Sequence, residues 1–228
     1  MENVSYNMNL ISQMIFLLMI NLSFSSINEK AGAFMLTRLQ YSGGGDWYGD
    51  PSSIPNLLEF IHNHTNVDVN KKENRAKIGE DEFYNSYYIY LTGHGNISFS
   101  DKEAQELRRF LLEGGFMHAD DNYGMDISFR REMKKVFPDK KWVELPSTHP
   151  IFNIYYQFNN GLPKIHEHNN KRPQALALFD NEKMIAIYTY ESDLGDGWED
   201  ENVHGDSEKI RQLALKMGAN IVLYSLSR

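Results

Sequence analysis

The sequence predicts an α/β fold, in which a mainly parallel, doubly wound sheet is flanked by helices on both faces. Short runs rich in β-branched and aromatic residues alternate along the chain with amphipathic segments of helical period. The runs at 87–92 and 116–119 are almost unbroken, as expected of strands that are covered on both faces. No internal repeat or low-complexity linker interrupts this alternation. We therefore predict a single domain over residues 31–228.

The predicted elements follow one another in a regular order. Strands are expected at 33–39, 67–69, 87–92 and 116–119, and a late β-hairpin at 175–179 and 184–190, forming an antiparallel edge or insertion. Helices are expected at 51–64, 101–113 and 127–136, and a last one starting near Ser207. The helix at 101–113 has the clearest start, because Ser100 and Glu103 form a capping box. Cap candidates for the helix at 51–64 are Asp50 and Ser52, and the charged segment 71–82 is expected to be exposed.

The composition excludes several classes of function. The chain has 228 residues, 41% of them hydrophobic, which suffices for one sizeable core. Its formal net charge is -8, so it lacks the basic surface of a phosphate-backbone binder, and no nucleic acid partner is expected. It has no cysteine, which excludes disulfides, a thiol nucleophile and thiolate-bound zinc.

Residues 1–30 differ from the rest and are predicted to form a leader. The apolar run at 11–24 is short for a membrane-spanning helix but suits the apolar region of a signal peptide, and small residues follow it. No Lys or Arg precedes the run and Glu2 is acidic, so a buried amino-terminal helix is the alternative. We expect an exported protein, periplasmic or membrane-associated, with possible membrane association through this leader.

Three polar loops follow predicted strands at the edge where open parallel sheets bind ligands. They are GGGDWYG at 43–49, GHG at 93–95 and HADDNYG at 118–124. Because the side-chain period of a strand is two, His118 and Asp120 should lie on one face. We expect His94 to join them around a pocket that Trp47 or Tyr48 overhangs.

The candidate catalytic residues are His118, Asp120 and Asp121, since a carboxylate paired with an imidazole can act as a general base. His94, His118 and Asp120 are also candidate metal ligands. A divalent metal is possible on this basis, although no specific signature such as HExxH is present and no cofactor is predicted. The structural alternatives are a hydrogen-bonded core histidine for His118, and helix caps for Asp121 and Asn122.

The candidate ligand-binding residues lie in the three loops and at one histidine before a proline. They are Gly44, Asp46, Trp47, Tyr48, Gly93, His94, Gly95 and His149. The glycine loop lacks the Lys-Ser/Thr of a phosphate loop, so a nucleotide is not expected. Its aromatic residues could stack on a sugar, while an ordinary Gly/Asp turn is the alternative. His166 and His168 have a His-x-His spacing that can bind a metal on a strand, but they lie in a polar segment and are expected at the surface.

Residues 87–124 resemble class I glutamine amidotransferase-like domains, which share a strand, a glycine loop, a helix, a Gly-Gly turn and a strand ending in a nucleophile elbow. The stretches LTRLQYSGGGDWYGDP, GHG, EGGFMHADDN, LPSTHPIF and GANIVLYSL resemble a bacterial family, the domain of unknown function 4159, over residues 33–228. This resemblance implies a flavodoxin-like topology, common in envelope-associated proteins, without an established activity. Where amidotransferases carry a cysteine, this chain has Asp120 or Asp121, so their thioester chemistry is excluded.

Two functions remain after this comparison. The first is an accessory protein of the cell envelope that binds a small ligand, a glycan or an envelope protein in the former active-site cleft. The alternative is a hydrolase with a His/Asp site, with or without a metal. The missing nucleophile favours binding, and the gathering of His and Asp residues favours hydrolysis.

Overall fold

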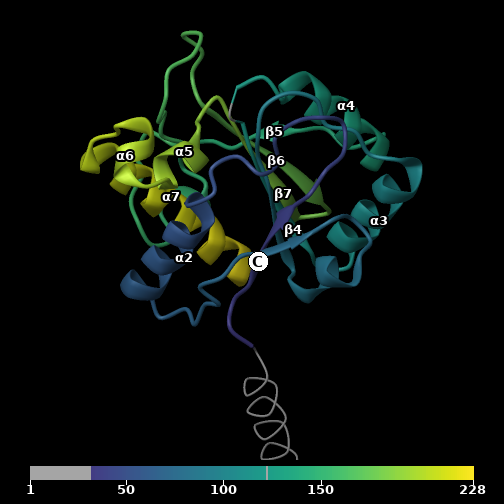
Figure 1. Cartoon of the computed structure of the whole chain (residues 1–228), viewed down its shortest axis with the longest axis horizontal. Helices are drawn as coiled ribbons and strands as arrows, with labels where there is room; N and C mark the ends of the chain where they lie inside the picture. Colours follow the sequence, from purple (N-terminus) through teal and green to yellow (C-terminus); the bar gives the residue numbers. More distant parts are fainter. Residues whose placement is uncertain (1–31, 122) are drawn as a thin grey trace, which may run out of the picture. The chain divides into compact units, whose positions relative to one another are not determined.

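A seven-stranded sheet with helices on both faces forms the centre of the protein (Figure 1). The computed structural model describes residues 32–121 and 123–228, so the predicted leader and Asn122 lie outside the described residues. The strands are β1 (Leu36–Leu39), β2 (Asn74–Ala76), β3 (Tyr88–Leu91), β4 (Phe116–Asp120), β5 (Val143–Glu144), β6 (Gln174–Asp180) and β7 (Lys183–Tyr190). The helices are α2 (Ser53–His64), α3 (Asp101–Leu112), α4 (Asp126–Val136), α5 (Leu194–Trp198), α6 (Glu201–His204) and α7 (Glu208–Ser227), with short 3-10 turns η1 (Asp81–Asn85) and η2 (Pro150–Phe152).

The sheet has the order β2-β1-β3-β4-β7-β6-β5. Strands β2, β1, β3, β4 and β7 pair in parallel, whereas β6 pairs antiparallel with β7 and with β5. The predicted α/β class with a mainly parallel sheet is therefore confirmed. The pairing of β3 with β4, in which Tyr90 lies opposite His118, also agrees with the prediction.

The structure corrects two expectations about strands. The predicted hairpin forms, but β7 lies inside the sheet beside β4, because its run from Met184 to Thr189 is buried throughout. Only β6 and β5 form the antiparallel margin. The other correction concerns 67–69, which contributes only a bridge between Val69 and Phe34. The edge strand is instead β2, which lies in the charged segment 71–82 that was expected only to be exposed. An edge strand has one neighbouring strand and tolerates polar and charged residues.

The helices divide the core into two layers. In Figure 1, α2, α5, α6 and α7 lie on one side of the sheet, and α3 and α4 on the other. The first layer packs apolar residues of α2, α5 and α7 against Tyr88, Tyr90 and Phe116. The second packs α3 and α4 against the alternate residues Ile89, Leu91 and others of the same strands. This alternation follows from the period of two along a strand.

Two of the predicted helix starts are confirmed and one is formed differently. Ser100 and Glu103 make the expected capping box on α3, and the Ser207 side chain caps α7. The side chain of Ser52 does not cap α2. Instead a carboxylate oxygen of Glu199 accepts the backbone N–H groups of Ser52 and Ser53, at 2.7 and 3.0 Å. This carboxylate lies 147 residues away in sequence from Ser52, out of reach of a local pattern.

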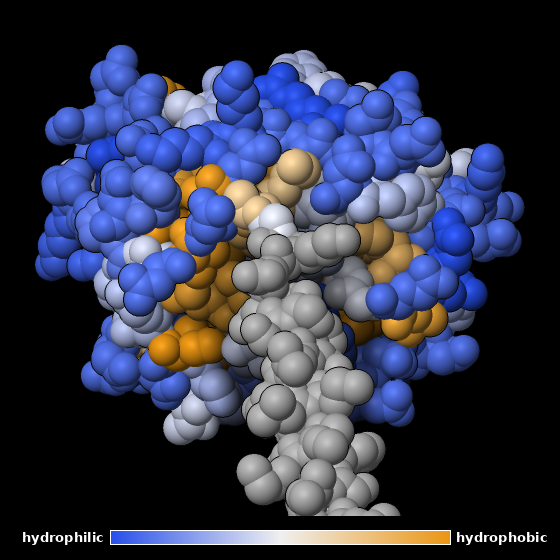
Figure 2. Space-filling model, turned by 90° about the horizontal axis from the view of Figure 1, so that it is seen from below, coloured by the Kyte–Doolittle hydropathy of each residue, from blue (hydrophilic) through white to orange (hydrophobic). Residues whose placement is uncertain are grey.

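The surface is mostly hydrophilic, with hydrophobic areas on the face seen from below in Figure 2. Among the larger apolar side chains, Leu112 and Leu226 are each 46% exposed. Within residues 32–121 and 123–228, no helix combines the length and the hydropathy needed to cross a membrane.

Arg38 of β1 is a buried charge that fixes the loop between β1 and α2. Its side chain is 1% exposed, and its guanidinium group donates to Glu73 at 2.8 Å. It also donates to the carbonyl oxygens of Gly49 at 2.6 Å and Asp50 at 3.0 Å. One side chain therefore holds the glycine-rich loop on the sheet.

We expect Arg38→Met to lower the free energy of unfolding by about 3–5 kcal/mol, because it leaves Oε2 of the largely buried Glu73 and the loop carbonyls without their donor. Urea unfolding followed by circular dichroism measures the change. Arg75→Met is the matched control: Arg75 binds the same carboxylate but its side chain is 48% exposed, so the expected loss is below about 1 kcal/mol. Equal losses in the two variants would contradict this interpretation.

Candidate functional site

The loops after β1 and β3 bind each other at the surface. Asp46 N–H donates to the His94 carbonyl at 3.2 Å, and the Asp46 carboxylate contacts His94 Nδ1 at 3.2 Å. The two side chains are 36% and 54% exposed. Tyr48 is 63% exposed beside Trp47, which packs on the core. Gly44, Gly93 and Gly95 provide the turns, with positive φ.

His118 does not join these loops. It is fully buried and lies opposite Tyr90 on β3. Tyr90 precedes His94 by four residues, so His118 lies below the loop that carries His94. Its ring contacts Tyr90 and Trp198, with centroids 5.2 and 5.8 Å apart. The expected convergence of His94 and His118 around one pocket is therefore absent from the described part of the structure. His149 is also elsewhere: its Nδ1 accepts from Ile151 N–H and its ring packs on Tyr224 of α7.

His118 and Asp120 belong to one buried hydrogen-bond chain. Tyr88 OH lies 3.2 Å from His118 Nδ1, and His118 Nε2 lies 3.0 Å from the hydroxyl of Thr189. That hydroxyl donates to Asp120. The arrangement is consistent with an imidazole that accepts at Nδ1 and donates at Nε2. Burial lowers the pKa of His118 to about 3, so this ring is neutral at pH 7.

Asp120, at the end of β4, holds the short helix α5. Its Oδ2 accepts the backbone N–H of Gly195 at 2.6 Å and the hydroxyl of Tyr90 at 3.3 Å. A carboxylate at a helix N-terminus satisfies donors that have no partner within the helix. Burial raises the pKa of Asp120 to about 7, while its bonds to Thr189 and Gly195 oppose that rise.

Further buried carboxylates surround Asp120. Asp121 and Asp193 are 3% and 1% exposed, and one oxygen of each, Oδ1, has no hydrogen-bond partner within the described chain. Burial, followed by the charge of Asp196, raises the pKa of Asp193 to about 9. Burial and the charge of Asp126 raise the pKa of Asp121 to about 6. Such a gathering of perturbed acids at a sheet edge is typical of a functional site.

Histidines from the connection between β5 and β6 and from α6 border this acidic group. His166 Nδ1 contacts Asp196 at 3.0 Å, and His166 Nε2 contacts Asp206 at 2.9 Å. His204 Nδ1 lies 3.7 Å from the same oxygen of Asp196. The bond to Asp196, and then that to Asp206, raises the pKa of His166 to about 8 against the effect of burial. His168 binds the second oxygen of Asp193.

The sequence reasoning missed Asp193, Asp196 and His204, and expected His166 and His168 at the surface. A signal was present: the stretch SDLGDGW begins two residues after the end of β7. The hairpin was expected at the antiparallel side of the sheet. The loop after its second strand was therefore not counted among the loops at the carboxyl ends of the parallel strands. With β7 beside β4, this loop lies at that edge.

A pocket of about 300 Å³ opens next to the buried acids. It is lined by Asp121, Tyr123, Gly124, Asp126, Ile127, Asn169, Lys171, Tyr190 and Glu191. Tyr123 is 47% exposed and stacks on His168, with ring centroids 4.7 Å apart. Of the residues chosen from the sequence, only Asp121 lines this pocket.

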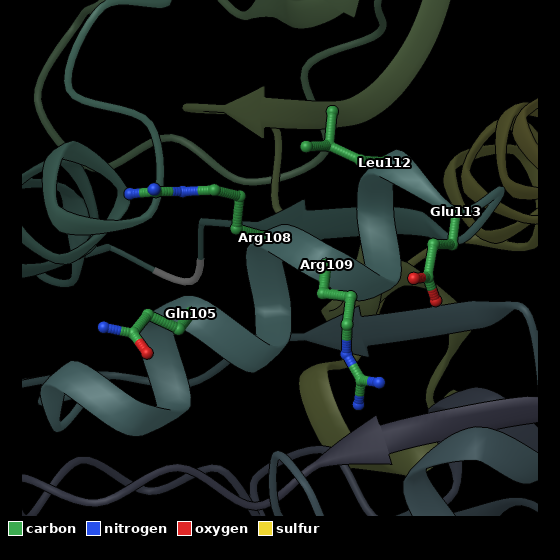
Figure 3. A pocket seen from close by; sticks show the side chains of 5 residues that line it. All are labelled: Gln105, Arg108, Arg109, Leu112 and Glu113. Atoms are coloured by element: carbon green, nitrogen blue, oxygen red, sulfur yellow. The ribbon is translucent and has the colours of Figure 1, made fainter.

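A second hollow, of about 370 Å³, lies along α3 (Figure 3). Its five lining side chains come from one helix and the turn after it. Arg109 is bound to Glu106, at 2.5 Å, and Arg108 donates to the carbonyl oxygens of Lys135 and Val136 at the end of α4. These arginines therefore serve the packing of α3, and we place the candidate site at the carboxyl edge of β4 and β7.

The fold and the site define an α/β domain with a histidine–aspartate cluster at the carboxyl edge of its sheet. A family model described as "Domain of unknown function (DUF4159)" matches residues 35–226, and the chain belongs to this family. The resemblance of the sequence to the domain of unknown function 4159 is thereby confirmed. No curated protein matches the chain.

The buried imidazole of His118 predicts a dependence of stability on pH. The pKa of His118 is about 3 in the folded state against 6.5 for an ordinary histidine, so below pH 6.5 only the unfolded chain takes up this proton. Stability therefore falls as the pH drops from 6.5 towards 3, with a slope of about 1.4 kcal/mol per pH unit from this group. In His118→Gln, which retains hydrogen-bonding atoms but does not titrate, urea unfolding at pH 7, 6 and 5 should show a slope smaller by that amount. Identical slopes in both proteins would contradict the assignment.

Proposed function

We propose that this protein is a ligand-binding domain that holds a neutral, hydroxyl-bearing ligand, such as a sugar unit of a glycan, in the pocket at the carboxyl ends of β4 and β7. The observation that carries the proposal is Asp121 Oδ1, a buried carboxylate oxygen without a partner in the described chain, on a residue that lines the pocket. A ligand hydroxyl would supply the hydrogen bond that burial has removed.

The other acids of the pocket are already paired. Asp126 accepts from Arg130 at 2.6 Å and from Tyr188 OH at 3.1 Å. Glu191 accepts from Lys164 at 3.1 Å and from Asn169 at 3.0 Å. This pairing leaves the acceptor of Asp121 for the ligand.

The composition of the pocket favours a neutral ring. Lys171 lies at its rim, 3.1 Å from Tyr190 OH and 3.7 Å from the Glu191 carboxylate, so its charge is matched within the pocket and is not available to an anionic ligand. The Asp121 carboxylate would repel an anion. Half-exposed Tyr123 offers the aromatic surface on which sugar rings pack. A hydroxyl-rich, uncharged ligand satisfies all three constraints.

The amidotransferase-like fold suggested by the sequence is also part of this proposal. It is supported by the adjacent parallel strands β3 and β4, which α3 connects, and by the polar turn after β4. Asp120 stands at the expected elbow, but its carboxylate binds Thr189, Tyr90 and Gly195 within the core. Because these hydrogen bonds occupy the carboxylate, Asp120 is poorly placed to activate a water molecule, which favours binding over hydrolysis. The predicted leader at 1–30 supports a place in the cell envelope, with a glycan or an envelope protein as partner.

The test is a glycan-array screen, followed by calorimetric titration of the sugar that binds. Asp121→Ala should weaken binding at least about tenfold, because it removes the buried acceptor. Circular dichroism and thermal unfolding establish that the variant is folded. Asp68→Ala, which removes an exposed acid from the segment after α2, is the control and should bind normally. Unchanged binding by Asp121→Ala, or no binding of any neutral sugar, would refute the proposal.

A further inference from the structure

The histidine–aspartate cluster at α5 and α6 has the geometry of a metal site. His166, Asp196 and His204 each offer one ligand atom, and these atoms lie within 4.8 Å of one another. Atoms bound at about 2.0–2.2 Å to one zinc-sized ion lie about 3–4 Å apart, so a small adjustment of side chains suffices. His166 comes from the connection between β5 and β6, Asp196 from α5 and His204 from α6, and the fold brings these three segments together.

We propose that His166, Asp196 and His204 bind one divalent transition-metal cation, with zinc as the best fit. Two imidazole nitrogens and one carboxylate oxygen form a donor set that suits zinc better than the hard cations magnesium and calcium, which prefer oxygen ligands alone. Three protein ligands leave the fourth tetrahedral position for water or a ligand atom. This site consists of residues other than His94, His118 and Asp120, which the sequence suggested.

Asp206 supplies the outer contact that such sites use. If Nδ1 of His166 faces the metal beside Asp196, its Nε2–H donates to Asp206, 2.9 Å away. A carboxylate on the far nitrogen of a metal-binding histidine fixes its tautomer and its orientation. Both ring nitrogens of His166 then have a role.

An independent observation points to a missing positive charge. The carboxylate of Asp193, three residues before Asp196, is 2% exposed, and its Oδ1 has no hydrogen-bond partner among the residues that the structure describes. Asp120, Asp121 and Asp196 add further negative charge around it. Buried carboxylates of this number are stabilised by a nearby cation.

The alternative is a metal-free ion pair in which a protonated His166 joins Asp196 to Asp206. That arrangement does not require His204, whereas the metal site does. His204 lies on α6, which has no buried residue, so it can be replaced without disturbing the core. The variant His204→Ala therefore separates the two explanations.

The experiment uses the full chain purified without a histidine tag, stripped with EDTA, dialysed and titrated with zinc chloride by calorimetry. One equivalent should bind. His204→Ala should weaken binding at least about tenfold, and Asp206→Asn about 10–100-fold. His62→Ala, which removes an exposed histidine from α2, should bind zinc as the wild type does. At equal zinc concentrations, zinc should raise the melting temperature of the wild type more than that of His204→Ala.

Zinc binding that is unchanged in His204→Ala, or several weak sites of equal affinity, would overturn the proposal in favour of the ion pair. A wild-type protein that binds no zinc at concentrations up to about 0.1 mM would also overturn the proposal. The proposal does not rest on the sugar pocket, and the two can fail separately. Asp121→Ala should still bind zinc, and His204→Ala should still bind the sugar in the presence of EDTA.

Discussion

The burial of the Asp120 carboxylate at the end of β4 is the constraint on which the site depends. Its oxygens accept hydrogen bonds from Thr189 of β7, Tyr90 of β3 and the backbone of Gly195. One carboxylate thus joins three neighbouring strands to α5. A buried charge is tolerated only when it is hydrogen-bonded in this way, and the position of α5 follows from that requirement.

The short helix α5 in turn connects the sheet to α7. Gly195 must be small, because a Cβ atom there would lie 2.7 Å from Tyr90 Oη and 3.2 Å from Asp120 Oδ2. At the other end of α5, the indole N–H of Trp198 donates to the carbonyl of Ala214 at 2.8 Å. The same ring packs on Tyr90 and His118. The aspartates at 193 and 196 are carried by this fixed helix, so their crowding is imposed by the fold.

Local sequence patterns were sufficient for most elements and insufficient for the site. Apolar periodicity and the Ser100–Glu103 capping box predicted the parallel strands and α3, because these signals lie within a few residues of one another. The sheet face on which His118 lies was also predictable, but its complete burial was not. Tyr88 and Tyr90 on the neighbouring strand β3 cover His118, and this follows from the pairing of the strands. Asp121 was identified from its place after β4. In the cluster, His166 lies 30 residues before Asp196, so no local pattern shows that the two side chains meet.

The pocket and the histidine–aspartate cluster are connected through His168 and Asp193. His168 binds Asp193 with one ring nitrogen, and its face stacks on Tyr123 at the mouth of the pocket. Besides burial, the charges of Asp196 in the cluster and of Asp121 in the pocket both raise the pKa of Asp193. A cation bound at the cluster would act on Asp193 in the opposite direction, because the field of a metal ion favours the charged form of nearby carboxylates. Asp193 and His168 are therefore the side chains through which the two proposed sites would influence each other.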